Sequence, residues 1–320
     1  MMNSHKRNIW VFGGTGFIGS ALVGRLLENP GNRIHTLVHK RIPGKKLESV
    51  NTFSGDLRTF DLTWLEKYPP DIVFHLARLG GANSITRYFA ARQGATANRR
   101  LIQFFRSTPK PPKIIYVSGS LIYGHQPEGV AADETAPLSP VAYARYYMTG
   151  EQPWIEAQKE RTLDVRFARP GWIVGPESWF KVFYWDYFQK TGKVPVYGDG
   201  MQMMSLIDVE DCAEQIANFG LQGNNMLNLN IFSGPPVSQF TFARSLAEIL
   251  NAGIETISQE QLQRMFGRTV REALTSSIPL TSCFPEIRSL TADRYPTMDA
   301  MLRKTLSFLK NKERILSESP

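Results

Sequence analysis

The sequence has few cysteines and no long apolar run, and each absence excludes a class of protein. Its 320 residues include two cysteines, Cys212 and Cys283, neither of which belongs to a CxxC pair. Two distant thiols cannot build a disulfide framework, so packing roles and a reduced, cytoplasmic location are expected. No stretch of about 18 apolar residues occurs, which argues against a transmembrane helix. Glycines interrupt the apolar segment near the start, so a secretory signal is not expected.

The chain also lacks a continuous basic pattern, although its formal net charge is +8. Lysine and arginine are dispersed, with short clusters in HKRIPGKK and KNKER. A basic protein attracts phosphates, nucleic acid or acidic metabolites. Without a basic stripe interleaved with stacking aromatics, however, nucleic acid is a poor candidate partner. We therefore predict neither a nucleic-acid partner nor a metal site, and expect a small-molecule ligand.

The first half of the chain alternates short apolar runs with helical patterns. Strands are predicted in NIWVFGG, RIHTLVH, VNTFSGD, PDIVFHLAR, PKIIYVSGS and LDVRFARPG, and a long helix over 82–107. Strands separated by helices indicate βαβ units with right-handed crossovers. The predicted fold class is therefore α/β, a Rossmann-like doubly wound parallel sheet.

A glycine-rich turn joins the first predicted strand to the first helix. Gly13, Gly16 and Gly19 stand three residues apart in WVFGGTGFIGS. The first permits a tight turn, the second lets the backbone approach a pyrophosphate, and the third lets the helix pack on the sheet. The helix N-terminus then offers unpaired N–H groups to phosphate. Because strand, glycines and helix occur together, the pattern predicts dinucleotide binding.

The end of the second predicted strand indicates which dinucleotide is preferred. An acidic residue there would bind the ribose 2′-hydroxyl of NAD. The sequence instead has His39, Lys40 and Arg41, which suit the 2′-phosphate of NADP, although a solvated basic turn is the alternative interpretation. We predict NADP(H) in preference to NAD(H). Asp56, which follows the third strand, is expected to contact the adenine.

After Gly175 the strand–helix rhythm ends, which suggests a second domain. The segment PESWFKVFYWDYFQKTGKVPVYGDG is aromatic and rich in turns, and roughly the last 80 residues are mostly helical. SLIDVEDCAEQIANFGL has the pattern of a short strand and a helix that return to the main sheet. We predict a dinucleotide-binding domain over 1–175 plus about 205–232, and a smaller, mostly helical substrate domain over 176–204 and 233–320.

Several segments, taken in order, resemble one known family. They are VFGGTGFIGS, SGDL, VFHLA, YVSGSLIYG, SPVAYARYYMTGE, RFARPGWIVGP, VPVYGDGMQ and LIDVEDCAEQI, and they span roughly residues 8 to 230. The sequence is similar to the extended short-chain dehydrogenases/reductases, also called the NAD-dependent epimerase/dehydratase family. The resemblance implies a dinucleotide in the N-terminal domain and a substrate, often a nucleotide-linked sugar, beneath the C-terminal domain.

The resemblance also implies which residues contact the cofactor. They are Gly13, Thr15, Gly16, Phe17, Ile18, Gly19, Asp56, Leu57, Leu76, Ala77, Tyr143, Tyr147 and Pro170. It further implies a homodimer that pairs through the helix carrying Tyr143 and the helix over 82–107, by analogy of fold. His75, at the end of the fourth strand, is expected to line the cofactor groove.

The chemistry of the family requires residues that this sequence has altered. Hydride transfer there uses a Tyr-x-x-x-Lys pair, in which the lysine holds the cofactor ribose and lowers the pKa of the tyrosine. Tyr143 matches the tyrosine, but Tyr147 occupies the lysine position, and no other Tyr-x-x-x-Lys occurs in the chain. Gly119 occupies the position of the family's Ser or Thr, between Ser118 and Ser120.

A third alteration concerns the substrate. Nucleotide-sugar members usually carry an arginine that grips the diphosphate, and Met204 stands at that position. A nearby aromatic cluster is more often core than substrate site, but it would also suit a substrate less polar than a sugar diphosphate. Its members are Trp179, Phe180, Phe183, Tyr184, Trp185 and Tyr187.

Two hypotheses follow from these alterations. The first is an NAD(P)-dependent oxidoreductase, epimerase or dehydratase with an atypical site, acting on a sugar, nucleotide sugar or other carbonyl or hydroxyl compound. Tyr143 would be the proton donor, assisted by Ser118 or Ser120, because reduction needs a neutral phenol. The second is a catalytically inactive NAD(P)-binding protein with a sensing, regulatory or partner-binding role.

Overall fold

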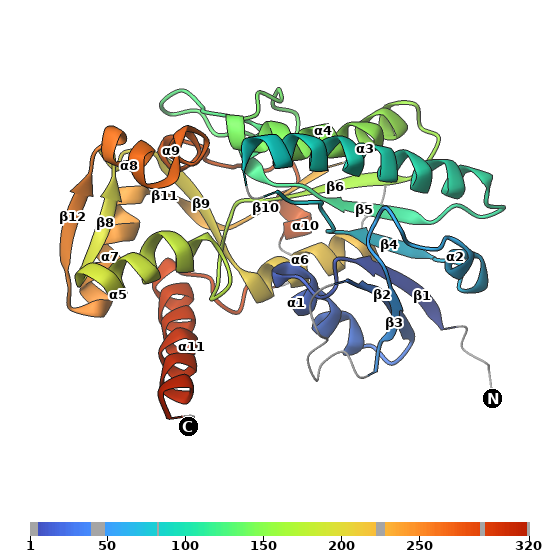
Figure 1. The fold of residues 1–320 in the computed structure, drawn as a ribbon, viewed down its shortest axis with the longest axis horizontal. Helices are drawn as coiled ribbons and strands as arrows, with labels where there is room; N and C mark the ends of the chain where they lie inside the picture. Colours follow the sequence, from blue (N-terminus) through green and yellow to red (C-terminus); the bar gives the residue numbers. More distant parts are fainter. Residues whose placement is uncertain (1–5, 40–48, 82, 222–227, 289–291, 319–320) are drawn as a thin grey trace.

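A seven-stranded parallel sheet forms the centre of the N-terminal part of the chain (Figure 1). The computed structural model describes residues 6–39, 49–81, 83–221, 228–288 and 292–318. The strand order is β10-β6-β5-β4-β1-β2-β3, which confirms the predicted Rossmann-like fold. The strands are β1 (Arg7–Phe12), β2 (Asn32–Val38), β3 (Asn51–Ser54), β4 (Ile72–His75), β5 (Lys113–Val117), β6 (Val165–Pro170) and β10 (Asn228–Ile231).

Helices cover both faces of this sheet (Figure 1). One face carries α1 (Phe17–Leu27) and α6 (Val209–Leu221), and the other carries α3 (Ser84–Ser107) and α4 (Ala142–Lys159), with the short α2 (Thr63–Lys67) near the β3 edge. Because side chains alternate along a strand, β1 contributes side chains to the hydrophobic core on each face of the sheet. Ile9 and Val11 pack with α1 and α6, whereas Trp10 and Phe12 pack on the α3 side.

The remaining elements form a smaller unit around two short sheets. One sheet contains β7 (Trp172–Val174), β9 (Met203–Asp208) and β11 (Ser233–Ser238), and the other β8 (Lys193–Tyr197) and β12 (Gly253–Ile257). Its helices are α5 (Asp186–Thr191), α7 (Gln239–Leu250), α8 (Gln259–Phe266), α9 (Arg268–Thr275) and α11 (Met298–Glu318), whereas the short α10 (Pro285–Arg288) packs against the core of the main sheet on the α1 and α6 side. The described residues contain no helix long and apolar enough to cross a bilayer.

The strand in SLIDVEDCAEQIANFGL differs from its prediction. This strand, β9, pairs with β7 and β11 and does not join the main sheet. The helix that follows it, α6, packs on α1, and β10 then adds to the edge of the main sheet beside β6. The physical reason is that β7, directly after β6, provides a free edge for β9. The domain boundaries given above stay a prediction.

His75 lies in the core of the sheet, which corrects the expectation that it lines the cofactor groove. Its side chain is 1% exposed, and its ring lies edge-on to Phe12 and Trp154. Nε2 is 2.9 Å from Oδ1 of Asn98 on α3. Burial lowers the pKa of His75 from 6.5 to about 4. Its role is therefore to link β4 to α3.

Buried His75 makes stability depend on pH with a definite sign. The unfolded chain binds a proton below pH 6.5 and the folded chain only near pH 4, so stability is lost as pH falls across this window. Between pH 7.5 and 4.5 the loss from this one group is about 2.5 kcal/mol. We expect His75→Gln to remove that part of the pH dependence, measured by urea unfolding at both pH values. An equal loss in wild type and variant would contradict this origin.

Candidate cofactor and substrate site

The turn between β1 and α1 is folded so tightly that side chains do not fit at two of its glycines. Gly13 has φ of +92°, in the region that favours glycine. A Cβ added to Gly19 would lie 2.0 Å from the carbonyl oxygen of Gly13. Gly16 precedes α1, and no side chain caps the N-terminus of that helix. A helix start without a side-chain cap is the kind of site where backbone N–H groups can bind a phosphate.

At the other end of the predicted cofactor groove, the carboxylate of Asp56 is already engaged. It accepts hydrogen bonds from Nη2 of Arg58 at 2.5 Å and from the backbone N–H of Arg58 at 2.8 Å. The Arg58 hydrogen bond is the largest of the effects that lower the pKa of Asp56 to about 2. Nε2 of His39 lies 3.9 Å from Oδ2 of Asp56, whereas Lys40 and Arg41 are outside the described residues.

Tyr143, Tyr147 and Glu151 occupy one face of α4, since residues four apart in a helix lie above one another. Tyr143 is 41% exposed, whereas Glu151 is completely buried. Burial raises the pKa of the Tyr147 phenol above its usual range, while the nearby Arg78 charge acts in the opposite direction. The face thus offers an exposed phenol at its start and a partly buried one at the lysine position.

The two predicted serines have different surroundings. The hydroxyl of Ser118 donates a 2.6 Å hydrogen bond to Oε2 of Glu151, and burial raises the pKa of that carboxyl. Ser120 begins a short 3₁₀ turn, Ser120–Ile122, and lines a cavity beside Tyr143. Between them, Gly119 has extended backbone, and a Cβ there would lie 3.8 Å from the Tyr147 hydroxyl. A side chain would therefore fit where the family has Ser or Thr.

Arg78 is a functional candidate that the sequence interpretation did not select. It follows β4 in HLARLGG, and its guanidinium carbon lies 4.3 Å from the centre of the Tyr147 ring. Nη2 donates to the carbonyl oxygens of Val117 at 2.9 Å and Ser118 at 2.7 Å. Arg87 on α3 lies 5.8 Å from the centre of the Tyr143 ring. Neither arginine lies in a motif that would have drawn attention to it.

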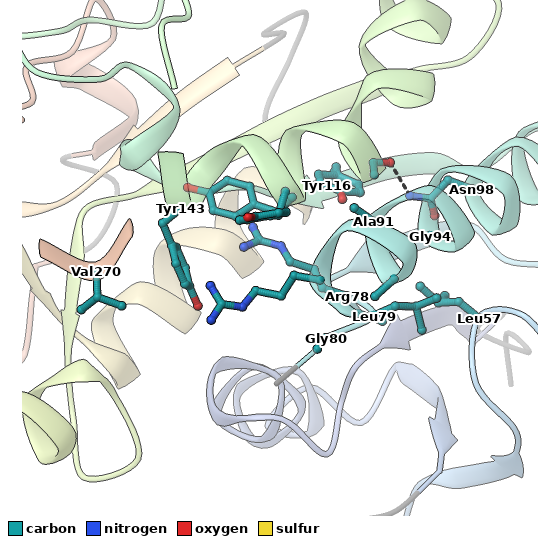
Figure 2. Close-up of a pocket in the computed structure, with 17 residues that line it drawn as sticks. Leu57, Arg78, Leu79, Gly80, Ala91, Gly94, Asn98, Tyr116, Tyr143 and Val270 are labelled. Carbon is teal, nitrogen blue, oxygen red and sulfur yellow. Dashed lines mark hydrogen bonds between the residues drawn. The ribbon is translucent and has the colours of Figure 1, made fainter. Parts of the chain in front are cut away.

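Two cavities meet at Tyr143 and Tyr147, and the first lies between the loop after β4 and helices α3 and α4 (Figure 2). Its volume is about 390 Å³, and its lining includes two predicted cofactor contacts, Leu57 and Ala77. Tyr143 stands at one end and Asn98 at the other in Figure 2. The described residues that line this cavity include two arginines, Arg78 and Arg87, and no carboxylate. It is therefore a positively charged space lined with phenols.

The second cavity, of about 610 Å³, lies between the start of α1, the loops after β5 and β6, and the smaller unit. Its wall on that side is apolar and is formed by Trp172, Trp179, Val182, Phe183, Val270, Ala273 and Leu274. Among the described lining residues, Arg78 and Glu177 carry charge. Four residues line both cavities: Arg78, Tyr143, Tyr147 and Val270.

The aromatic cluster after Gly175 divides between core and cavity. Phe180, Tyr184 and Trp185 are buried in the core of the smaller unit, whereas Trp179 and Phe183 line the second cavity. Met204 is 4% exposed in the same core and is not part of the cavity lining. Of the remaining predicted cofactor contacts, Phe17, Ile18 and Pro170 line the second cavity. Leu76 packs against the core beneath the glycine turn, to which Thr15 belongs.

The glycine turn, the parallel sheet and the cavities beside α4 define a dinucleotide-binding oxidoreductase fold. The sequence profile of the NAD dependent epimerase/dehydratase family matches residues 9–231, and the chain belongs to this family. The family relationship, together with the glycine turn, identifies the chain as an NAD(P)-binding protein with a Rossmann-like domain.

Two related proteins are about one quarter identical to this chain over the aligned residues. The epimerase family protein YfhF of Bacillus subtilis is 27% identical over 263 residues, which cover 76% of this chain and 79% of that protein. The UDP-glucose 4-epimerase of Mycolicibacterium smegmatis is 24% identical over 262 residues, which cover 76% and 82%.

Solved structures extend the likeness over nearly the whole chain. The dTDP-glucose 4,6-dehydratase of Bacillus anthracis, in complex with NAD, superposes with a TM-score of 0.77 at 18% identity and covers 96% of this chain and 98% of that one. A human epimerase family protein with NADPH gives a TM-score of 0.73 at 19% identity, with 94% and 99% coverage. At these identities the likeness establishes the fold.

Proposed function

We propose that this protein is an NADP(H)-preferring oxidoreductase that acts on a carbonyl or hydroxyl group, with Tyr143 as its proton donor. The observation that carries the proposal is the position of Tyr143, whose side chain lines both cavities and remains accessible. The residues present fit a dinucleotide, because the crowded Gly13–Gly19 turn and the uncapped start of α1 form a cradle for phosphate.

In a reduction, the residues of this chain would deliver the proton and enclose the substrate. When bound, a reduced nicotinamide supplies the hydride. The Tyr143 phenol donates its proton to the carbonyl oxygen as that oxygen gains charge, and then recovers a proton from solvent. A neutral phenol is the form required, so this direction needs no lysine to ionise Tyr143. Ser120 lines the same cavity, and we propose that its hydroxyl hydrogen-bonds the substrate oxygen.

We propose a low-polarity, uncharged substrate in place of a nucleotide sugar. The wall of the second cavity contributed by the smaller unit is mainly apolar, and Glu177 is its one charged residue among the described lining residues. The apolar residues of that wall offer a diphosphate no charged partner, and burying unpaired charge is costly. The buried position of Met204 supports this proposal, because a grip on the diphosphate from that position would require rearranging the core.

The proposed preference for NADP(H) rests on charge at the ends of β2 and β3. Asp56 is held by Arg58, and His39 is half exposed beside it. We expect NADPH to bind at least about tenfold more tightly than NADH, since a 2′-phosphate would gain at least one charge-assisted contact. Fluorescence titration with both nucleotides measures the ratio, and equal affinities would contradict the preference.

An inactive NAD(P)-binding protein is the second candidate function. It is supported by Tyr147 in place of lysine, Gly119 in place of a hydroxyl residue, and the bond that ties Ser118 to Glu151. The deciding experiment mixes the protein with NADPH and a panel of aromatic and aliphatic aldehydes and ketones, and follows absorbance at the nicotinamide band. Tight binding without consumption favours the second function, and consumption favours the first.

We also propose that the chain forms a homodimer through α3 and α4. Three large apolar side chains near the start of α3 are exposed to solvent: Ile85, Tyr88 and Phe89. A groove between α3 and α4 lies beside Tyr88. Light scattering on the purified protein tests this proposal directly, because a monomeric mass at micromolar concentration would contradict it.

A further inference from the structure

A cation lies beside Tyr147 although the family's lysine is absent from that position. It is Arg78, which comes from the loop after β4 and not from α4. We propose that Arg78 provides the positive charge that positions the nicotinamide nucleotide, with the Tyr147 ring as the surface on which its guanidinium rests. This inference rests on the proposed cofactor binding and adds to it a residue with no counterpart in the Tyr-x-x-x-Lys motif.

The guanidinium of Arg78 is held on two sides. Its carbon lies 4.3 Å from the centre of the Tyr147 ring, a distance at which the ring face attracts a cation. Nη2 donates to the carbonyl oxygens of Val117 and Ser118, at the end of β5. Both bonds use the same nitrogen, so they anchor one end of the planar group. Arginine also stays charged in such surroundings, where burial would draw a lysine towards its neutral form.

The charge of Arg78 is directed into the space that a cofactor would occupy. Arg78 lines both cavities, as Tyr143 does. Within the described part of the chain, no carboxylate forms an ion pair with Arg78, and none lines the first cavity. The charge of Arg78 acts on the buried Glu151, where it opposes the burial that raises the pKa of that carboxyl. In the first cavity, a ligand that carries phosphate or ribose oxygens would therefore meet a cation with no carboxylate among the described lining residues.

The pairing also explains why the lysine position holds a tyrosine. A lysine at 147 would bring a second positive charge close to the guanidinium, and like charges at that distance repel each other. A phenol at the same position instead supplies an aromatic face. Arg78 in the loop and Tyr147 on the helix thus complement each other. The positive charge comes from the loop after β4 and not from α4.

Arg87 is the alternative source of charge at this site. Its guanidinium carbon lies 5.7 Å from the Tyr146 ring and 5.8 Å from the Tyr143 ring, farther than Arg78 lies from Tyr147. Arg78 lines both cavities, whereas Arg87 lines the first alone. The structure therefore favours Arg78, and the two arginines are compared in the experiment.

The test is a set of full-length variants titrated with NADPH by fluorescence at low and high salt. Arg78→Gln keeps a donor for the two carbonyl groups but removes the charge, and we expect NADPH to bind at least about tenfold more weakly. Arg78→Lys retains the charge and is expected to stay within about threefold of wild type. In Arg78→Gln/Tyr147→Lys, the charge returns to the helix, and the affinity is expected to recover to about the same level.

Matched controls separate this role from general damage. Lys67 rests on Trp64 of α2, with its Nζ 5.2 Å from the centre of the ring, so Lys67→Gln removes a cation–ring pair outside both cavities. Its affinity for NADPH should equal that of wild type. Tyr147→Leu tests the aromatic face independently of Arg78→Gln. We expect its binding to weaken by about threefold or more, with melting temperatures recorded for every variant.

The outcomes distinguish this inference from the proposal beneath it. Unchanged NADPH affinity in Arg78→Gln, or weakening in Arg87→Gln alone, would overturn the role of Arg78 and leave cofactor binding intact. A loss in Arg78→Gln that neither Arg78→Lys nor the double variant recovers indicates a structural role, and would also overturn it. Wild-type protein that binds neither NADPH nor NADH would overturn the proposed function itself.

Discussion

Gly19→Ala is expected to abolish the binding of nicotinamide nucleotides. The added Cβ would lie 2.0 Å from the oxygen and 2.8 Å from the carbon of the Gly13 carbonyl. These are backbone atoms, so relief requires the turn itself to open, and the N–H groups that face the phosphates then lose their arrangement. We expect the dissociation constant for NADPH to rise by roughly a hundredfold or more, measured by calorimetry.

The control for this substitution is a glycine with space around it. Gly253 in β12 has no atom within 4 Å of an added Cβ and no positive φ, so Gly253→Ala should bind NADPH as wild type does. Retained affinity in a folded Gly19→Ala protein would show that the phosphates do not dock on this turn. Circular dichroism spectra of both variants establish that the fold persists.

Tyr143→Phe is expected to lower turnover strongly and to change cofactor affinity much less. The substitution deletes the hydroxyl on an accessible side chain and preserves the ring beside Arg87, so little packing is lost. Loss of a positioned proton donor typically lowers kcat by about 10²- to 10⁴-fold. The measurement is NADPH consumption with the best carbonyl substrate of the panel, together with NADPH titration of the same variant.

A second phenol provides the comparison. Tyr68 lies at the end of α2, outside both cavities, so Tyr68→Phe should leave kcat unchanged. If Tyr143→Phe retains full turnover, another group delivers the proton and the proposed mechanism fails. If kcat and cofactor affinity fall together, the hydroxyl serves mainly to hold the nucleotide.

The main sheet could be predicted from the sequence because its strands are fully covered. Buried parallel strands appear as short continuous apolar runs, and IWVF, IVFH and KIIYV each match a strand in the structure. The glycine turn could also be predicted, since its spacing is local and each glycine has its own steric reason. Family membership followed from segments that are likewise continuous in sequence.

The parts that the sequence did not indicate depend on contacts between distant segments. Arg78 and Tyr147 are 69 positions apart, and nothing in HLARLGG indicates that its arginine would rest on a tyrosine of α4. Glu151 likewise looks like a solvated helix residue until Ser118 is placed against it. For β9, an apolar run shows that a strand exists but not which edge it joins.

The two cavities have part of their walls in common, and this has a thermodynamic consequence. Val270 from α9 touches both spaces, together with Arg78 and Tyr143. A ligand bound in one cavity orders these side chains for the other cavity as well. The loss of conformational entropy on ordering them therefore occurs only once. Affinities for nucleotide and substrate are therefore expected to be cooperative, and by linkage each ligand strengthens the other by the same factor. After one product is released, the protein therefore binds the other product less tightly.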